Sequence, residues 1–148
     1  MSEKFDSLMT KMVVVGVILG GLIVAGRYGW KRQERDWRDA ARKDDLLIIE
    51  QAAHKYFRQY KCYFPEEIMK DCGGKGLEFQ IKGVPCDPVT GEPYGYELPD
   101  EDCAESFRLY AQLENTESFE VEKAGCREGC GRDRKYNYKL VRWPVFDY

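Results

Sequence analysis

The sequence predicts an α+β protein. A long N-terminal helix, transmembrane in its first half and amphipathic in its second, packs on a small antiparallel sheet in a disulfide-bearing head. Three observations predict this: an uncharged apolar run near the N-terminus, a helix-forming stretch after it, and cysteines and strand patterns confined to the remainder. The 148 residues divide into a cytoplasmic N-terminus (1–11), a transmembrane helix (12–29), a stalk and amphipathic helix (30–61) and a globular head (62–148).

The first element is the apolar run Met12–Gly26, which contains no charged residue. A membrane-spanning helix needs about 20 apolar residues. The run reaches this length if Lys11 extends its amine to one interface and Tyr28 and Trp30 occupy the other. A cleaved signal peptide is the alternative, because a short apolar run ending in small residues fits that pattern too. The helical pattern that continues after Gly26 favours a retained anchor.

Glycines lie at intervals within the apolar run. Gly16 and Gly20 are four residues apart, with Gly21 beside them. On a helix, such spacing makes a flat strip that lets a second helix approach closely, so we expect Gly16, Gly20 and Gly21 to form a packing surface. Because glycine is common in membrane helices, the ordinary composition of such helices explains the spacing equally well.

The stretch from Lys31 to Lys61 contains no proline or glycine, which predicts a helix. Its charges alternate in sign up to Asp45, as is typical of a solvated helix with ion pairs between successive turns. An apolar stripe at three- and four-residue steps follows: Leu46, Ile49, Ala53, Tyr56 and Tyr60. A stripe of this kind is able to cover one face of a sheet.

The head is defined by its six cysteines and three alternating runs. The cysteines predict disulfides, because all lie on one side of the apolar run and their spacing does not suit a zinc site. Proximity in the sequence suggests the pairs Cys62–Cys72, Cys86–Cys103 and Cys126–Cys130. The strands are expected at Tyr94–Leu98, Phe107–Leu113 and Tyr136–Val141, in a sheet with one wet and one dry face.

The two indications of membrane topology disagree. Two lysines precede the apolar run and seven basic residues follow it: Arg27, Lys31, Arg32, Arg35, Arg38, Arg42 and Lys43. The positive-inside rule would therefore leave the C-terminus in the cytoplasm. Six cysteines in that part of the chain indicate an oxidising compartment instead. We follow the cysteines and expect a single-pass membrane protein with an extracytoplasmic C-terminus.

Four segments, taken in order, resemble type IV pilins and the pseudopilins of type II secretion. They are the Arg-Asp-Ala run in Trp37–Leu46, the tyrosine-bearing helix end in Ile49–Pro65, the DP-x-x-G-x-x-Tyr-x-Tyr loop in Cys86–Tyr96, and the strand in Phe107–Asn115. The loop is most similar to that of the major pseudopilin. The resemblance covers nearly the whole chain and implies the helix-on-sheet fold already predicted.

The N-terminus departs from that family. Its members carry a prepilin peptidase site, with a glutamate a few residues into the span. Extending the match backwards without gaps places Asp6 and Ser7 at the cleavage junction and Lys11 at the position of the glutamate. In the family this acid is thought to pair with the N-terminus of a neighbouring subunit within the lipid. The chain therefore either assembles unprocessed in another way, or has a pilin-like fold and does not polymerise.

The sequence contains no set of residues that suits catalysis, and no cofactor is expected. The single histidine, His54, lies on a charged helix and is expected at the surface. Calcium is the one candidate ligand, because related pseudopilins bind it in this region and acidic residues gather here: Asp87, Asp100, Asp102 and Glu105. Basic and aromatic residues alternate from Arg127 to Trp143, but the acidic balance of the chain, with a net charge of −3, favours a solvated sheet over nucleic-acid binding.

The resemblance and the anchor together predict a structural role. We expect a subunit of a helical filament or secretion pseudopilus, which would lie in the inner or cytoplasmic membrane before an assembly machinery takes it up. It would reach the cell surface or the exterior if assembled. A monomeric, membrane-tethered binding module with the same fold is the alternative.

Overall fold

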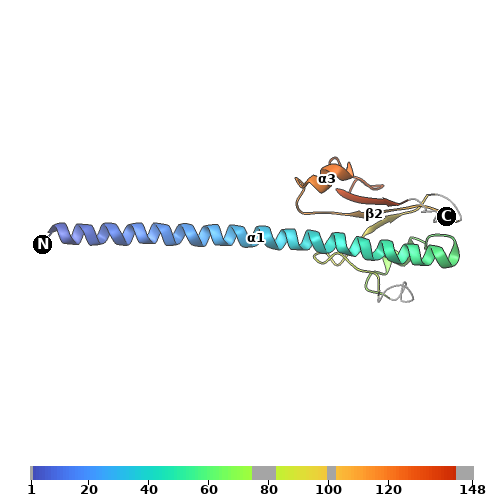
Figure 1. The fold of residues 1–148 in the computed structure, drawn as a ribbon, viewed down its shortest axis with the longest axis horizontal. Coiled ribbons are helices and arrows are strands. Elements are labelled where there is room, and N and C mark those ends of the chain that lie inside the picture. Colours follow the sequence, from blue (N-terminus) through green and yellow to red (C-terminus); the bar gives the residue numbers. More distant parts are fainter. Residues whose placement is uncertain (1, 75–82, 100–102, 143–148) are drawn as a thin grey trace. The chain divides into compact units, whose positions relative to one another are not determined.

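The computed structural model describes residues 2–74, 83–99 and 103–142. The chain divides into two units, one up to Asp36 and one from Trp37, and helix α1 (Ser2–Tyr60) passes through both. The other elements, all in the second unit, are α2 (Glu67–Lys70), β1 (Gly95–Glu97), β2 (Phe107–Ala111), α3 (Phe119–Ala124) and β3 (Tyr138–Arg142) (Figure 1). The arrangement is that of an α+β protein.

The first unit consists of the N-terminal part of α1, which contains the candidate membrane span. From Lys11 onward it is long and apolar enough to cross a membrane, and no residue of its most apolar window is buried. A signal sequence near the N-terminus would meet the same criteria of length and composition. The expected candidate span is thus present, within one helix that continues without a break into the amphipathic stretch.

The second unit is built on a three-stranded antiparallel sheet in the order β1-β2-β3. Tyr96 pairs with Leu109, and Leu109 with Leu140 across the sheet. Strands β2 and β3 lie alongside the C-terminal part of α1 in Figure 1. The core between them includes four residues of α1 (Leu46, Ile49, Ala52 and Ala53) and side chains of β1 and β2, chiefly Tyr96, Phe107, Leu109 and Ala111. The predicted stripe therefore packs on the sheet through Leu46, Ile49 and Ala53, with Tyr56 partly buried, as expected of an amphipathic helix, but Tyr60 is 52% exposed.

The other face of the sheet is not simply wet, as the alternating pattern predicted. Tyr110 points to that face and is only 3% exposed. Its ring stacks on Tyr136 at 5.6 Å between centroids, and its hydroxyl donates to Glu97 at 2.9 Å. A Cβ at Gly95 would come within 2.6 Å of the Tyr136 ring, so glycine is needed where that ring crosses β1.

All six cysteines are in disulfides: Cys62–Cys103, Cys72–Cys86 and Cys126–Cys130. The predicted disulfides are present and the Cys126–Cys130 pair is confirmed. The other two predicted pairs, Cys62–Cys72 and Cys86–Cys103, are wrong. Proximity in the sequence fails for them because backbone pairing brings Cys62 to Cys103, 41 positions away, and Cys72 to Cys86, 14 positions away.

The end of α1 illustrates how this happens. The residue after Cys62, Tyr63, donates its backbone N–H to the carbonyl of Ala104 at 2.9 Å. That hydrogen bond lays the exit from the helix against the approach to β2, and places the Cα atoms of Cys62 and Cys103 5.0 Å apart. This distance suits a disulfide.

Removal of single disulfides should lower the unfolding free energy by different amounts, because the rings that the disulfides close differ in size. Cys62 and Cys103 are separated by 41 positions, Cys126 and Cys130 by 4. Chain entropy then predicts that the double alanine variant of the first pair loses about 4 kcal/mol of unfolding free energy, and that of the second about 2 kcal/mol. Denaturant unfolding of the full chain in detergent measures both. Equal losses, or a larger loss for the short ring, would contradict the connectivity.

Candidate functional site

A buried guanidinium lies in the second unit, where α1 meets two other segments of the chain. The side chain of Arg42, on α1, is only 4% exposed. Its Nη1 donates to Asp39 at 2.8 Å and to Glu114 at 2.9 Å, and its Nε donates to Asp87 at 2.7 Å. These carboxylates come from α1, from a loop before β1 and from the chain after β2. We call Arg42, Asp39, Asp87 and Glu114 the Arg42 cluster.

Within the cluster, Asp39 also fixes the backbone after β2. Its carboxylate accepts the backbone N–H of Glu114 at 2.8 Å and that of Asn115 at 2.9 Å. On the outside, Arg38 forms two hydrogen bonds with the carboxylate of Glu114, at 2.7 and 2.6 Å. This paired geometry is the strongest that an arginine makes with a carboxylate. One turn of α1 thereby holds the end of β2 in place.

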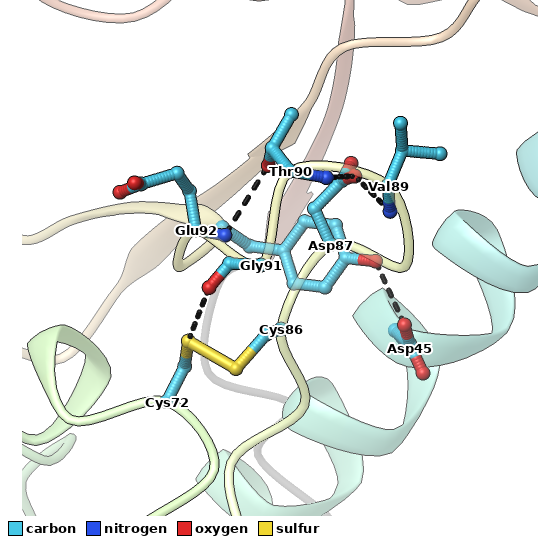
Figure 2. Close-up of a disulfide and its surroundings, with 9 residues drawn as sticks. Asp45, Cys72, Cys86, Asp87, Val89, Thr90, Gly91 and Glu92 are labelled. Atoms are coloured by element: carbon cyan, nitrogen blue, oxygen red, sulfur yellow. Dashed lines mark hydrogen bonds between the residues drawn. A yellow bond between two sulfur atoms is a disulfide. The ribbon is translucent and has the colours of Figure 1, made fainter.

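Asp87 plays a similar part in its own loop, Cys86–Pro93. Its Oδ1 accepts the backbone N–H groups of Val89 at 2.9 Å and Thr90 at 3.0 Å, as Figure 2 shows. Gly91 then turns the chain with a φ of +70°, a conformation that glycine adopts without strain. The Asp-Pro-x-x-Gly pattern is thus a turn in which the aspartate side chain both closes the loop and faces Arg42.

A disulfide holds the same loop from its other side. Gly73 donates its N–H to the carbonyl of Val84 at 2.7 Å, and this brings Cys72 to Cys86, the residue before Asp87 (Figure 2). The predicted partners of these two cysteines were wrong because this pairing was not visible in the sequence.

Beyond the loop, a second contact ties the same chain segment to α1. The hydroxyl of Tyr94 donates to the carboxylate of Asp45 at 2.7 Å. The Arg-Asp-Ala run and the DP-x-x-G-x-x-Tyr-x-Tyr loop, noted separately in the sequence, are therefore in contact at two points.

The charges in the cluster shift one another's protonation. Hydrogen bonds from Arg38, and then from Arg42, lower the pKa of Glu114 to about 2, although burial opposes the shift. For Asp87, burial raises the pKa, but the hydrogen bond from Arg42 and the loop N–H groups outweigh it, so that the pKa falls. Burial raises the pKa of Asp45 and outweighs the hydrogen bond from Tyr94.

The predicted packing glycines lie on the uncovered part of α1. A Cβ added at Gly16, Gly20 or Gly21 would meet nothing within 4 Å. At about 100° per residue, Gly16 and Gly20 share one face of the helix, whereas Gly21 points about 100° away from Gly20. The strip thus consists of two glycines.

The acidic residues proposed for calcium are not brought together in the described parts. Asp87 is occupied by Arg42 and by its own loop, and Glu105 is exposed. Asp100 and Asp102 lie outside the described residues. Among residues 2–74, 83–99 and 103–142, no group of three metal-ligating side chains is arranged around a common point. Calcium binding stays a prediction.

His54 is not the surface residue that was expected. Its side chain is 28% exposed and lies edge-on to the rings of Tyr63 and Phe107, each at 6.0 Å. The Tyr63 hydroxyl is 3.3 Å from its Nδ1. The ring therefore borders the core, to which Tyr63 and Phe107 belong.

Some of the basic residues near the C-terminus also have structural partners. Arg132 pairs with Glu66 at 2.8 Å, and the amine of Lys135 lies 5.7 Å from the centre of the Tyr136 ring. The Arg132 contact ties the loop before β3 to the rest of the head, and the Lys135 contact lies within that loop, in keeping with the structural interpretation of this basic and aromatic stretch. Nucleic-acid binding was not expected, and these contacts do not test it.

Loss of the central cation should destabilise the head strongly. The Arg42→Ala variant leaves three carboxylates close together without their counter-charge, and we expect a loss of about 3–5 kcal/mol in unfolding free energy. The control is Lys43→Ala, whose side chain is 27% exposed and pairs with the exposed Glu120; its loss should cost about 1 kcal/mol or less. Denaturant unfolding compares them. Equal losses would show that burial of Arg42 has no special weight.

The cluster should also make stability depend on acid. Because the folded pKa of Glu114, about 2, lies below the ordinary 4.5, its ionised form stabilises the head. That contribution is complete above the ordinary value and is lost as the pH falls through about 2. The lowered pKa of Asp87 makes stability fall with acid in the same way, whereas the raised pKa of Asp45 has the opposite effect on the pH dependence of stability. Melting temperatures across this range should fall less steeply for Glu114→Gln than for the unaltered chain. Parallel curves of melting temperature against pH for the two proteins would contradict a stabilising role for ionised Glu114.

Comparison with protein-family models, with curated protein sequences and with solved structures gives no match for this chain. The resemblance to pilins and pseudopilins thus depends on the residues of this chain alone. The Arg42 cluster gives two of those segments a common physical purpose, which is to join α1 to the loops at the edge of the sheet.

Proposed function

We propose that this protein is a structural subunit of a type IV pilus-like filament or secretion pseudopilus, without enzymatic activity. The observation that carries the proposal is that the most apolar window of α1 has no buried residue. A helix that is apolar all round requires lipid or other apolar helices around it. A filament core supplies such helices, and a membrane would surround the same segment before assembly.

A second observation extends this surface beyond the apolar run. Within the second unit, α1 exposes four large apolar side chains, of which Tyr60 lies at its end and three lie on the face turned away from the sheet. These are Trp37 at 75%, Leu47 at 42% and Ile48 at 42% exposure. Their position on a helix that packs its opposite face on a sheet supports contact with neighbouring subunits rather than a role in the head's own core.

The Arg42 cluster supports the family resemblance. Contacts between the Arg-Asp-Ala run and the Asp-Pro loop give a reason for both patterns to occur in one chain. Arg42 binds Asp87, and Asp45 accepts a hydrogen bond from Tyr94. A rigid head of this kind, with three disulfides, suits the exterior of a filament in an oxidising compartment.

The alternative, a monomeric membrane-tethered binding module, is favoured by one observation. Lys11 occupies the position at which the family carries its glutamate, so a negative charge is not available there to pair with a neighbouring N-terminus. An unprocessed chain that stays in the membrane would need no such pairing.

The packing glycines provide the test. Gly20→Leu places a large side chain on the Gly16 and Gly20 face, where helices would approach most closely. We expect it to abolish filaments in material sheared from cells that make the full-length chain, as seen by electron microscopy. The head should stay folded, with its disulfides intact by mass spectrometry. Mass spectrometry of the N-terminus then reports whether Met1 is retained.

Gly26→Leu is the matched control. It adds the same side chain at another open position of the apolar run, about 120° around the helix from Gly20. Filaments from Gly26→Leu but not from Gly20→Leu would support packing through the glycine strip. Filaments from both variants would contradict it. The absence of filaments even from the unaltered chain, with the protein left in the membrane fraction, would favour the tethered module.

A further inference from the structure

The basic residues that follow the apolar run fall into two groups. Four of the seven have carboxylate partners: Arg35 with Asp36 at 3.2 Å, Arg38 with Glu114 at 2.6 Å, Arg42 with its cluster, and Lys43 with Glu120 at 2.6 Å. The remaining three are Arg27, Lys31 and Arg32. They form no ion pair with any other described residue, and all three are exposed.

The three unpaired cations directly follow the apolar run, which ends at Gly26. A rise of 1.5 Å per residue places Arg27 and Arg32 about 7.5 Å apart along the helix axis. The headgroup layer on each side of a bilayer is about 5–7 Å deep, from a total of 40–45 Å and a hydrocarbon core of 30 Å. The apolar run Met12–Gly26 covers about 22 Å of that core, so Arg27 begins near the edge of the core and reaches the headgroups by extending its side chain, whereas Lys31 and Arg32 lie at headgroup depth.

Two aromatic residues occupy the same stretch of helix. Tyr28 is 79% exposed and Trp30 is 73% exposed, so neither is part of a protein core. Exposed tyrosine and tryptophan beside an apolar run are typical of a membrane interface, where the ring meets the lipid chains and its polar atom meets water or headgroups. Their placement agrees with that of the three cations.

We propose that Arg27, Lys31 and Arg32 bind the phosphate groups of anionic phospholipids in the leaflet where the apolar run ends. Guanidinium groups bind phosphate through two parallel hydrogen bonds, and the lysine amine acts as a point charge. Anionic headgroups then take the place of the carboxylates that pair with the other four basic residues. The proposal rests on the proposed membrane anchoring.

The net charge of −3 does not oppose this binding. Several of the carboxylates in the second unit are held in ion pairs at fixed positions, among them Asp87 and Glu114. Surface fields also decay within about 10 Å at ordinary salt, so distant acids have little effect at the headgroups. The local balance at residues 27–32, which is three cations and no acid, determines the interaction.

Lipid selectivity of the full-length chain tests this proposal. The protein is reconstituted in phosphatidylcholine vesicles that contain spin-labelled phosphatidylglycerol or spin-labelled phosphatidylcholine, and electron spin resonance reports which lipid lies at its boundary. The test variant carries Arg27→Gln, Lys31→Gln and Arg32→Gln. The control removes three exposed cations from the second unit instead, through Arg58→Gln, Lys70→Gln and Lys123→Gln, and thus has the same net charge.

We expect the unaltered chain to prefer phosphatidylglycerol over phosphatidylcholine at its boundary. Each cation that reaches a lipid phosphate should raise this relative affinity by up to about fivefold. The test variant should lose this preference, and the control should keep it. Added salt should weaken the preference, whereas millimolar free phosphate should not displace the lipid. An unaltered chain that resists extraction by carbonate but shows no preference would overturn the lipid site and leave the anchor intact. A chain that carbonate extracts would overturn the anchoring itself, and the lipid site with it.

Discussion

The arrangement of the head depends on one requirement, which is that the buried positive charge of Arg42 must be paired with carboxylates. Burial of an ion costs several kcal/mol unless its hydrogen-bonding groups are met with good geometry. Arg42 meets this requirement only when α1, the Asp87 loop and the end of β2 are all in place. A helix displaced by one residue would turn this side chain by about 100° and leave Asp87 and Glu114, the two carboxylates from outside the helix, without their counter-charge. The cluster thus selects one register of the helix against the loops, while the apolar core supplies most of the driving force.

The disulfides and the cluster hold different ends of the same interface. Cys62 lies just beyond the end of α1, and Arg42 lies 20 positions earlier, about 30 Å along a helix. Between these points, the core packs on the sheet through small and medium side chains such as Ala52 and Ala53. A small head with a thin core is thereby fixed covalently at one end and electrostatically at the other.

Patterns that depend on local chemistry could be predicted from the sequence. The apolar run, the stripe from Leu46 to Tyr60 and the three strands follow from periodicity, and the antiparallel sheet follows from alternation. What could not be predicted depends on contacts between distant segments. Glu114 shows no sequence signal, yet it completes the Arg42 cluster. Two disulfides were mispaired for the same reason, and Tyr110 is covered by a ring from a loop 26 positions later.

The Cys62–Cys103 bridge has a mechanical consequence. A tensile load that enters the head through α1 reaches Cys62 and then has a covalent route directly to Cys103, four residues before β2 begins. Residues 63–102, which include the Asp87 loop and β1, are bypassed by that route. The head can therefore carry force from its helix into the central strand of its sheet without stretching the loops. Extension under load would be limited to residues on the load path, and residues 63–102 would carry no tension.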